Sequence, residues 1–156
     1  AKRQPQIHYD DRLLLSALIS KRPVPIEMAE NVPNGAAYDY DRRTVIVQRG
    51  MDGQDLFRCV SLAMARAELD QTEHADPQAD AFRGYCVSYM LCRKYGVDAR
   101  GYDFSRLPES LRDADSQTIR SELTDIRDTL QTMTGRMERA LEQSRTAAQK
   151  NVRKER

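Results

Sequence analysis

The chain has 156 residues, of which 31% are charged, with 25 Lys and Arg against 24 Asp and Glu. Its length allows a hydrophobic core without disulfides or a metal, and its near-zero net charge excludes a strong overall attraction to nucleic acid or anionic lipid. No run of about 18 or more apolar residues occurs, and residues 1–11 lack the apolar centre of a secretory signal, so we expect a cytoplasmic protein without a membrane segment.

The first third of the chain predicts a short helix followed by strands. Residues 11–20 include LLLSALIS after two aspartates, and Pro23 ends this predicted helix because proline cannot donate to the helix ladder. Apolar residues at 26–28 indicate a strand, and VPNG at 32–35 indicates a turn. Residues 36–48 read AAYDYDRRTVIVQ, which is typical of a hairpin. We therefore predict an antiparallel sheet of about three strands.

The middle third predicts two helices. Asp52 is a suitable N-cap for a helix over residues 54–70, which follows helical periodicity. The polar loop that follows ends at Pro77, a common first-turn residue. The next predicted helix, residues 78–95, contains GYCVSYMLC and is apolar almost all round, which indicates burial on every side; Gly96 ends it.

A long helix is predicted over residues 115–148, after a connecting loop at 101–110, with Asp115 or Ser116 as its cap. Its apolar residues alternate in steps of four and three, which is typical of a coiled-coil seam. The seam consists of Ile119, Leu123, Ile126, Leu130, Met133, Met137 and then Ala140 or Leu141.

The predicted fold class is α+β, with a small antiparallel sheet of about three strands packed on helices and a long C-terminal helix. We divide the chain into residues 1–111 and a C-terminal helix, 112–156, with a basic tail. The seam either packs on the chain's own helices, our first interpretation, or joins two copies into a homodimer, or binds another protein. Met133 and Met137 are its expected exposed end, because methionine suits adaptable surfaces.

Three ordered segments resemble the ImmA/IrrE-type metallopeptidase-like domains of bacterial plasmids and integrative elements. They are PNGAAYDYDRRTVIVQRG, then LFRCVSLAMARAEL, then FRGYCVSYMLCRKYGVDARGYDF. The resemblance covers about residues 24–107 and implies a zincin-like fold. In active relatives a helix carries His-Glu-x-x-His, which places two imidazoles on one Zn²⁺ with the glutamate as general base.

Every one of those catalytic positions is changed in this chain. Aligned on Phe57, Ala65, Ala67 and Glu68, the resemblance places the two histidine positions at Leu62 and Arg66 and the base at Ala63. It places the third, acidic ligand at either Gln78 or Tyr85, neither of which is a carboxylate. We therefore predict no metal, no cofactor and no enzymatic activity: a pseudoenzyme.

Arg66 has a special place in this prediction, because it puts a permanent cation where a relative holds Zn²⁺, and the two charges would repel. One interpretation makes Arg66 an anchor for an anion or a carboxylate. The other makes it an ordinary arginine that is paired with Glu68 or Asp70 or exposed to solvent.

The function predicted first is a non-catalytic protein-interaction module of a mobile genetic element, acting in regulation or as an antirestriction or other anti-defence factor. Its partner would be a host or element protein, of which a nuclease complex is a concrete case. The predicted partner-binding residues are Arg66, Leu123, Ile126, Leu130, Met133 and Met137.

Two alternatives remain open from the sequence. The first is a residual metal-dependent hydrolase with a relocated site at His74, Asp76 and Asp80, for which His8 is a weak further ligand candidate. The second is a nucleic-acid-binding accessory protein that contacts phosphates in a salt-sensitive way. The residues proposed for it are Arg42, Arg43 and Arg49 near the hairpin and Arg145, Lys150, Arg153, Lys154 and Arg156 in the tail.

The three cysteines, Cys59, Cys86 and Cys92, do not indicate a disulfide scaffold. Cys86 and Cys92 lie in the most apolar predicted helix, where a free cysteine behaves as a small hydrophobic residue. Cys59, one turn before Leu62, is expected to line the former metal cleft.

Overall fold

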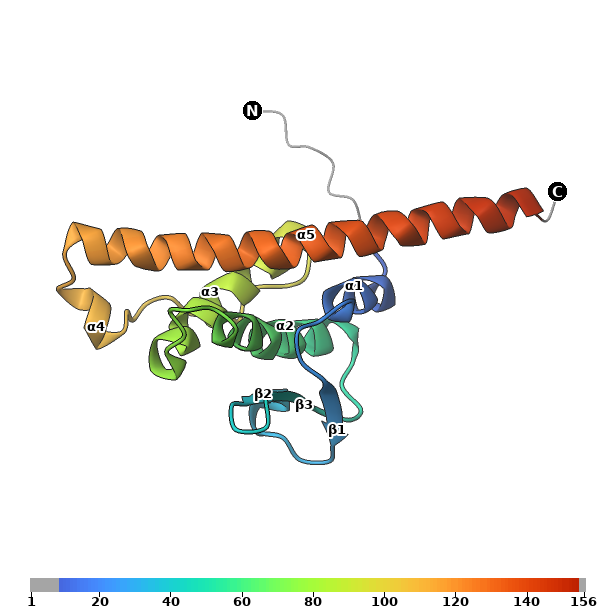
Figure 1. The fold of residues 1–156 in the computed structure, drawn as a ribbon. Helices are drawn as coiled ribbons and strands as arrows, with labels where there is room; N and C mark the ends of the chain where they lie inside the picture. Colours follow the sequence, from blue (N-terminus) through green and yellow to red (C-terminus); the bar gives the residue numbers. More distant parts are fainter. Residues whose placement is uncertain (1–8, 155–156) are drawn as a thin grey trace.

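The structure, a computed structural model, describes residues 9–154, and it describes Lys154 only as part of a helix. The helices are α1 (Asp11–Ile19), α2 (Gly53–Asp70), α3 (Pro77–Tyr95), α4 (Glu109–Arg112) and α5 (Ser116–Lys154). The strands are β1 (Ile26–Ala29), β2 (Ala36–Asp39) and β3 (Thr44–Gln48). In Figure 1, α5 runs across the top, α1, α2 and α3 lie beneath it, and the sheet lies at the bottom.

The sheet confirms the predicted α+β class, but the prediction that all its strands are antiparallel is wrong. Its strand order is β1-β3-β2, and β2 is antiparallel to β3 as the predicted hairpin requires. β1 is parallel to β3, with Ile26 opposite Val45. The sheet is mixed because β3, whose Val45 and Val47 are buried, takes the centre, and the chain crosses from one edge to the other between β1 and β2.

A tight turn of 3-10 type, Pro33–Gly35, makes that crossing at the predicted VPNG segment. Gly35 has a φ of 83°, a left-handed conformation that favours glycine. A Cβ added there would lie 2.8 Å from both the Cys59 Sγ and the Met51 Sδ. The turn therefore needs glycine both for its backbone angle and for its close approach to α2.

The predicted boundaries of α1, α2 and α3 hold to within one residue, and the predicted caps Asp52 and Asp115 act as such, as does Asp76, which was not predicted to be a cap. The Asp52 and Asp76 carboxylates accept backbone N–H groups in the first turns of α2 and α3, at 3.2 Å and 3.1 Å. Gly96 ends α3 with a φ of 73°, and the Asp115 carboxylate accepts a backbone N–H of α5 at 2.8 Å. α5 runs to Lys154, six residues beyond the predicted end.

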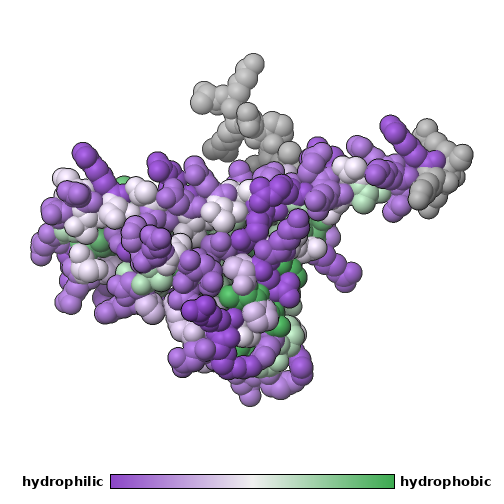
Figure 2. Space-filling view, in the orientation of Figure 1, coloured by the Kyte–Doolittle hydropathy of each residue, from purple (hydrophilic) through white to green (hydrophobic). Residues whose placement is uncertain are grey.

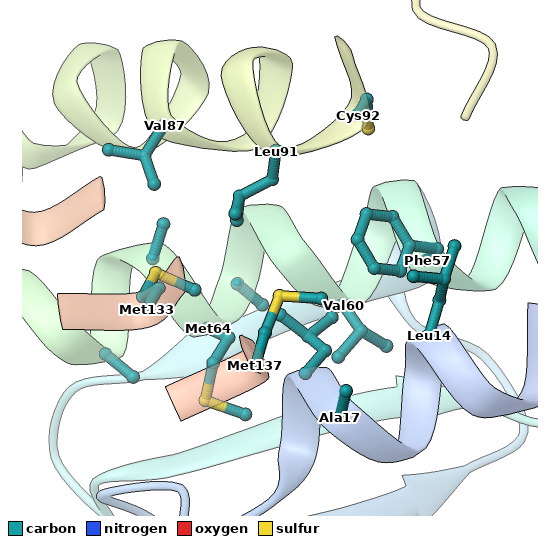
Figure 3. Close-up of a cluster of buried hydrophobic side chains, with 14 of the residues drawn as sticks. Leu14, Ala17, Phe57, Val60, Met64, Val87, Leu91, Cys92, Met133 and Met137 are labelled. Atoms are coloured by element: carbon teal, nitrogen blue, oxygen red, sulfur yellow. The ribbon is translucent and has the colours of Figure 1, made fainter. Parts of the chain in front are cut away.

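The core lies between α2 and the helices around it, and α2 also covers one face of the sheet. Figure 3 shows side chains from four helices meeting in one cluster. They are Leu14 and Ala17 of α1, Phe57, Val60 and Met64 of α2, Val87, Leu91 and Cys92 of α3, and Met133 and Met137 of α5.

The apolar seam of α5 packs within the chain, as our first interpretation expected, but its exposed end is not the predicted one. Met133 and Met137 are each 1% exposed, and Ile126 is also buried. By contrast Leu123 is 60% exposed and Ile119 is 42% exposed. The prediction failed because it weighed side-chain chemistry alone: the middle of α5 lies over α1 and α3, which bury whatever apolar residues stand there.

The C-terminal third of α5 continues past the rest of the molecule. Residues 142–153 are all exposed, and Figure 1 shows this part of the helix projecting beyond the other helices. Figure 2 shows the projecting part as mostly hydrophilic with a small, weakly apolar patch. Val152 is an exposed apolar residue of this part of the helix. Among the described residues no helix combines the length and apolarity needed to cross a membrane.

Candidate functional site

A pocket of about 400 Å³ lies between β2, α2 and α3. The three positions to which the resemblance assigned the metal ligands and the base, Leu62, Ala63 and Arg66, all line it from α2. The helix identified from the sequence therefore does border a pocket. The other lining residues are Pro33, Asn34, Ala36, Ala37, Tyr38, Ala81, Phe82, Tyr85, Asp103 and Arg106.

The structure also separates the two candidates for the third ligand position. Tyr85 of α3 lines the same pocket as Arg66. Gln78 instead lines a groove of about 350 Å³ between α3, α4 and α5, together with Thr118 and Glu122. Of the two alignments, only the one that selects Tyr85 gathers all its positions around one space.

Arg66 does not make either of the salt bridges expected of an ordinary arginine. Glu68 lies 2.9 Å from Arg136 of α5, and Asp70 accepts a hydrogen bond from the Tyr38 hydroxyl at 2.6 Å. Within residues 9–154, Arg66 has no ion pair, and its Nε is buried without a hydrogen-bond partner. The half-buried side chain instead contributes an unpaired donor and a positive charge beside the pocket.

Gly84 on the facing helix leaves space for the Arg66 side chain. A Cβ at Gly84 would lie 3.1 Å from the Arg66 Cγ and 3.5 Å from its backbone nitrogen. Glycine thus allows α2 and α3 to approach closely at this level, with the aliphatic part of Arg66 between them. Sequence reasoning did not select Gly84, because a glycine inside a helix gives no sign of which neighbour it accommodates.

A second buried donor lies near Arg66. The Tyr40 hydroxyl is buried and has no hydrogen-bond partner in the described part of the chain, and its ring packs edge-on against Tyr38 at 4.6 Å. Burial raises the pKa of Tyr40, while the charge of Arg66 acts in the opposite direction. Tyr40 therefore remains a neutral hydroxyl, which can donate or accept a hydrogen bond, and it does not line the pocket.

The loop after α3 completes the pocket and is held in place by aromatic residues. The Asp103 backbone N–H donates to the Tyr85 hydroxyl at 2.6 Å, and the Phe104 ring lies 5.1 Å from the Tyr85 ring and 5.0 Å from the Tyr89 ring. This anchoring places Asp103 and Arg106 at the pocket. The sequence predicted a connecting loop here but did not reveal which charged side chains it brings to the site.

The proposed relocated metal site is not assembled. Asp80 is fully buried, and its carboxylate accepts hydrogen bonds from Arg83 at 3.0 Å and from the Asp76 backbone at 3.2 Å. The Asp76 carboxylate caps α3, and His74 lies beside α5, 3.6 Å from a carboxylate oxygen there. Across residues 9–154 no group of three or more His, Cys, Asp or Glu side chains is placed to hold a metal ion. His8 lies outside the described residues.

The arginines near the hairpin, proposed as phosphate contacts, are mostly paired with acids of β1 and the segment after it. Arg42 lies 2.6 Å from Glu27, and Arg49 lies 2.8 Å from Glu30. Both pairs are exposed, so they contribute little to stability, yet each reduces the positive charge offered to a phosphate. Arg43, at the hairpin turn, is exposed with a φ of 48°.

The basic residues of the tail lie far from the hairpin in Figure 1, at the projecting end of α5. Arg145, Lys150 and Arg153 are exposed there, while the side chain of Lys154 and the whole of Arg156 lie outside the described part. The two basic groups therefore do not form one continuous surface for nucleic acid.

The cysteines are not placed for nucleophilic catalysis. Burial raises the pKa of all three thiols, that of Cys86 to about 11, so little thiolate is present near neutral pH. Cys92 is fully buried beside the Tyr102 hydroxyl, at 3.6 Å. Cys59 does not line the pocket as expected; it packs beneath the turn at Gly35.

Comparison of the chain with protein-family models, with curated proteins and with solved structures finds no match. The resemblance to ImmA/IrrE-type domains therefore stays a prediction drawn from the quoted segments. The pocket that the structure places beside Leu62, Ala63 and Arg66 is the basis of the proposal below.

Proposed function

We propose that this chain is a non-catalytic protein-interaction module whose binding site is the pocket between β2, α2 and α3. The observation that carries the proposal is Arg66, which lines the pocket and forms no ion pair with any of residues 9–154. An unpaired guanidinium in a pocket wall can donate to an acceptor of a ligand, which supports a role in binding.

The side chains at the former metal positions support binding over chemistry. General acid or base catalysis needs a group that exchanges a proton near neutral pH. Leu62 and Ala63 are aliphatic, and an arginine side chain offers only donors and no acceptor to take up a proton. These three residues can contact, orient or attract a ligand, but none can activate a water molecule.

An open strand edge supports a protein as the ligand. β2 is an edge strand, and Ala36 and Ala37 also line the pocket. Within residues 9–154, β2 makes its backbone hydrogen bonds with β3 only. Exposed edges of this kind bind extended peptide segments by strand addition, with nearby pockets selecting side chains.

The resemblance supports a biological setting for such a module. Three segments of the chain resemble the ImmA/IrrE-type domains of plasmids and integrative elements, so the proposed partner is a host or element protein, and the proposed role is regulation or anti-defence. A host nuclease complex is the concrete candidate. The chain would act by occupying a surface of that partner.

Selection from a displayed library of random peptides tests the proposal. Ala37→Trp fills the pocket from β2, and Gln131→Trp, at an exposed position of α5, is the matched control. Circular dichroism establishes that both variants are folded. We expect selected peptides to bind the wild type and Gln131→Trp equally and to bind Ala37→Trp at least about ten-fold more weakly.

Two results would overturn the proposal. The first is that selected peptides bind Ala37→Trp as tightly as they bind the wild type, since the pocket would then not be the site. The second is that mass spectrometry finds the bound peptides cleaved, and that Ala37→Trp abolishes the cleavage, since the pocket would then be catalytic.

A further inference from the structure

We infer that the group recognised in this pocket is a single carboxylate of the bound protein, held between Arg66 and Arg106. The inference rests on the proposed binding function and deepens it by naming the chemical class of the ligand. Its support comes from the two arginines, from the charge balance of the pocket and from the way each arginine is positioned.

Arg66 supplies the inner donor. It lines the pocket and forms no ion pair in the described part of the chain. Arginine presents its N–H groups in a planar fork that matches the two oxygens of a carboxylate. A guanidinium only donates, so the ligand it suits is an acceptor.

Arg106 supplies the outer donor from a different element. It lines the same pocket from the loop after α3, and it forms no ion pair with any of residues 9–154. The loop is attached to α3 through the hydrogen bond from the Asp103 backbone to the Tyr85 hydroxyl and through the tilted contact of the Phe104 ring with the Tyr85 ring. The attachment of this loop to α3 therefore places Arg106 at the pocket, although the Arg106 side chain is exposed.

The charges that line the pocket favour a monoanion. Arg66 and Arg106 contribute two positive charges and Asp103 contributes one negative charge, which leaves one net positive charge. The Asp103 carboxylate accepts the Ser105 backbone N–H at 2.9 Å, which lowers its pKa and keeps it ionised. A single carboxylate balances this pocket, whereas a phosphate dianion would leave an excess of negative charge.

The position of Arg66 favours one binding geometry. Gly84 holds the aliphatic part of Arg66 between α2 and α3, and its acidic neighbours are engaged elsewhere, Glu68 with Arg136 and Asp70 with Tyr38. The guanidinium is thus available to an incoming group without first breaking a salt bridge. Such preorganisation lowers the entropic loss on binding.

Nuclear magnetic resonance titration tests the inference with small probes. The reporters are the Arg66 Nε–H signal, identified by its absence in Arg66→Gln, and the backbone amides of β2. N-acetylglutamate N-methylamide carries only a side-chain carboxylate, and N-acetylalanine carries only a C-terminal one, so the two probes distinguish the possible sources. N-acetylglutamine N-methylamide is the neutral control, and inorganic phosphate tests the charge argument at matched ionic strength.

We expect at least one carboxylate probe to bind saturably and to shift both reporters, while the neutral probe does not. Arg66→Gln should weaken binding at least about ten-fold, the effect of removing one charge-assisted hydrogen bond. Arg106→Gln should weaken binding several-fold. The affinity of Arg66→Lys should lie between those of the wild type and Arg66→Gln, because lysine keeps the positive charge but lacks the planar fork. Arg120→Gln, at an exposed position of α5, is the matched control and should not alter binding.

The inference is overturned if the neutral probe binds as well as the carboxylates, if phosphate binds more tightly, or if Arg66→Gln leaves the affinity unchanged. These failures differ from a failure of the proposed function. If Ala37→Trp weakens the binding of displayed peptides but Arg66→Gln does not, the proposed interaction module stands and only the inference of a bound carboxylate fails.

Discussion

The packing of α5 against the rest of the chain makes a quantitative prediction about two apolar residues of the same seam. Met133 is 1% exposed, whereas Leu123, ten residues earlier, is 60% exposed. Truncating a buried methionine to alanine removes its contacts and leaves a cavity, which typically costs about 2–5 kcal/mol. Truncating an exposed leucine usually changes stability by no more than about 0.5 kcal/mol.

We therefore expect Met133→Ala to lower the free energy of unfolding by about 2–5 kcal/mol and Leu123→Ala to leave it nearly unchanged. For a domain of this size each kcal/mol lowers Tm by roughly 2–4 °C. Urea denaturation followed by circular dichroism at 222 nm measures both variants, and the slope m shows whether unfolding stays two-state.

The reasoning fails if Leu123→Ala costs as much as Met133→Ala, or if Met133→Ala costs less than about 1 kcal/mol. Protein concentration supplies a further check. If a second copy covered Leu123, the midpoint of unfolding would rise with concentration, and Leu123→Ala would remove that dependence.

Three further predictions follow from the core and from the projecting end of α5. Arg83→Ala leaves the fully buried Asp80 without its cation, so it should lower the free energy of unfolding by about 3–5 kcal/mol in urea titrations; a loss under about 1 kcal/mol would contradict the buried pairing. Ellman's reagent should not modify Cys92 in the folded chain and should modify Cys86 slowly at neutral pH. The rate of Cys86 modification should rise as the pH approaches about 11. Rapid modification of both thiols at pH 7 would show that they are not buried. Deleting residues 142–156 should leave the free energy of unfolding within about 0.5 kcal/mol of the full chain, because residues 142–153 are exposed; a large loss would show that the projecting helix supports the core.

Local sequence signals predicted most of the elements. Asp52 and Asp115 cap helices, and Gly96 ends one, because caps and stops depend on hydrogen bonds and backbone angles within a few residues of the chain. The hairpin at 36–48 was predicted for the same reason. The failures came where a partner is distant in sequence: the parallel pairing of β1 with β3 is not encoded in any local pattern.

The pocket shows the same division between local and distant information. Leu62, Ala63 and Arg66 were selected from sequence through the resemblance to a His-Glu-x-x-His helix, whose spacing places them on one face of α2. Asp103, Arg106 and Gly84 were missed, because their relation to Arg66 depends on how α3 and its following loop pack against α2. No spacing rule connects residues that lie about 18 to 40 positions apart in the chain.

The sequence by itself determined the α+β class, most helix boundaries, the hairpin and the face of α2 on which Leu62, Ala63 and Arg66 lie, since each of these rests on short-range periodicity and backbone preference. Only the tertiary structure decided that this face borders a pocket, that Arg66 lies there without a salt bridge to any of residues 9–154, and that Met133 and Met137 are buried while Leu123 is not. Burial and pairing depend on which surfaces meet, and that is a property of the packed chain as a whole.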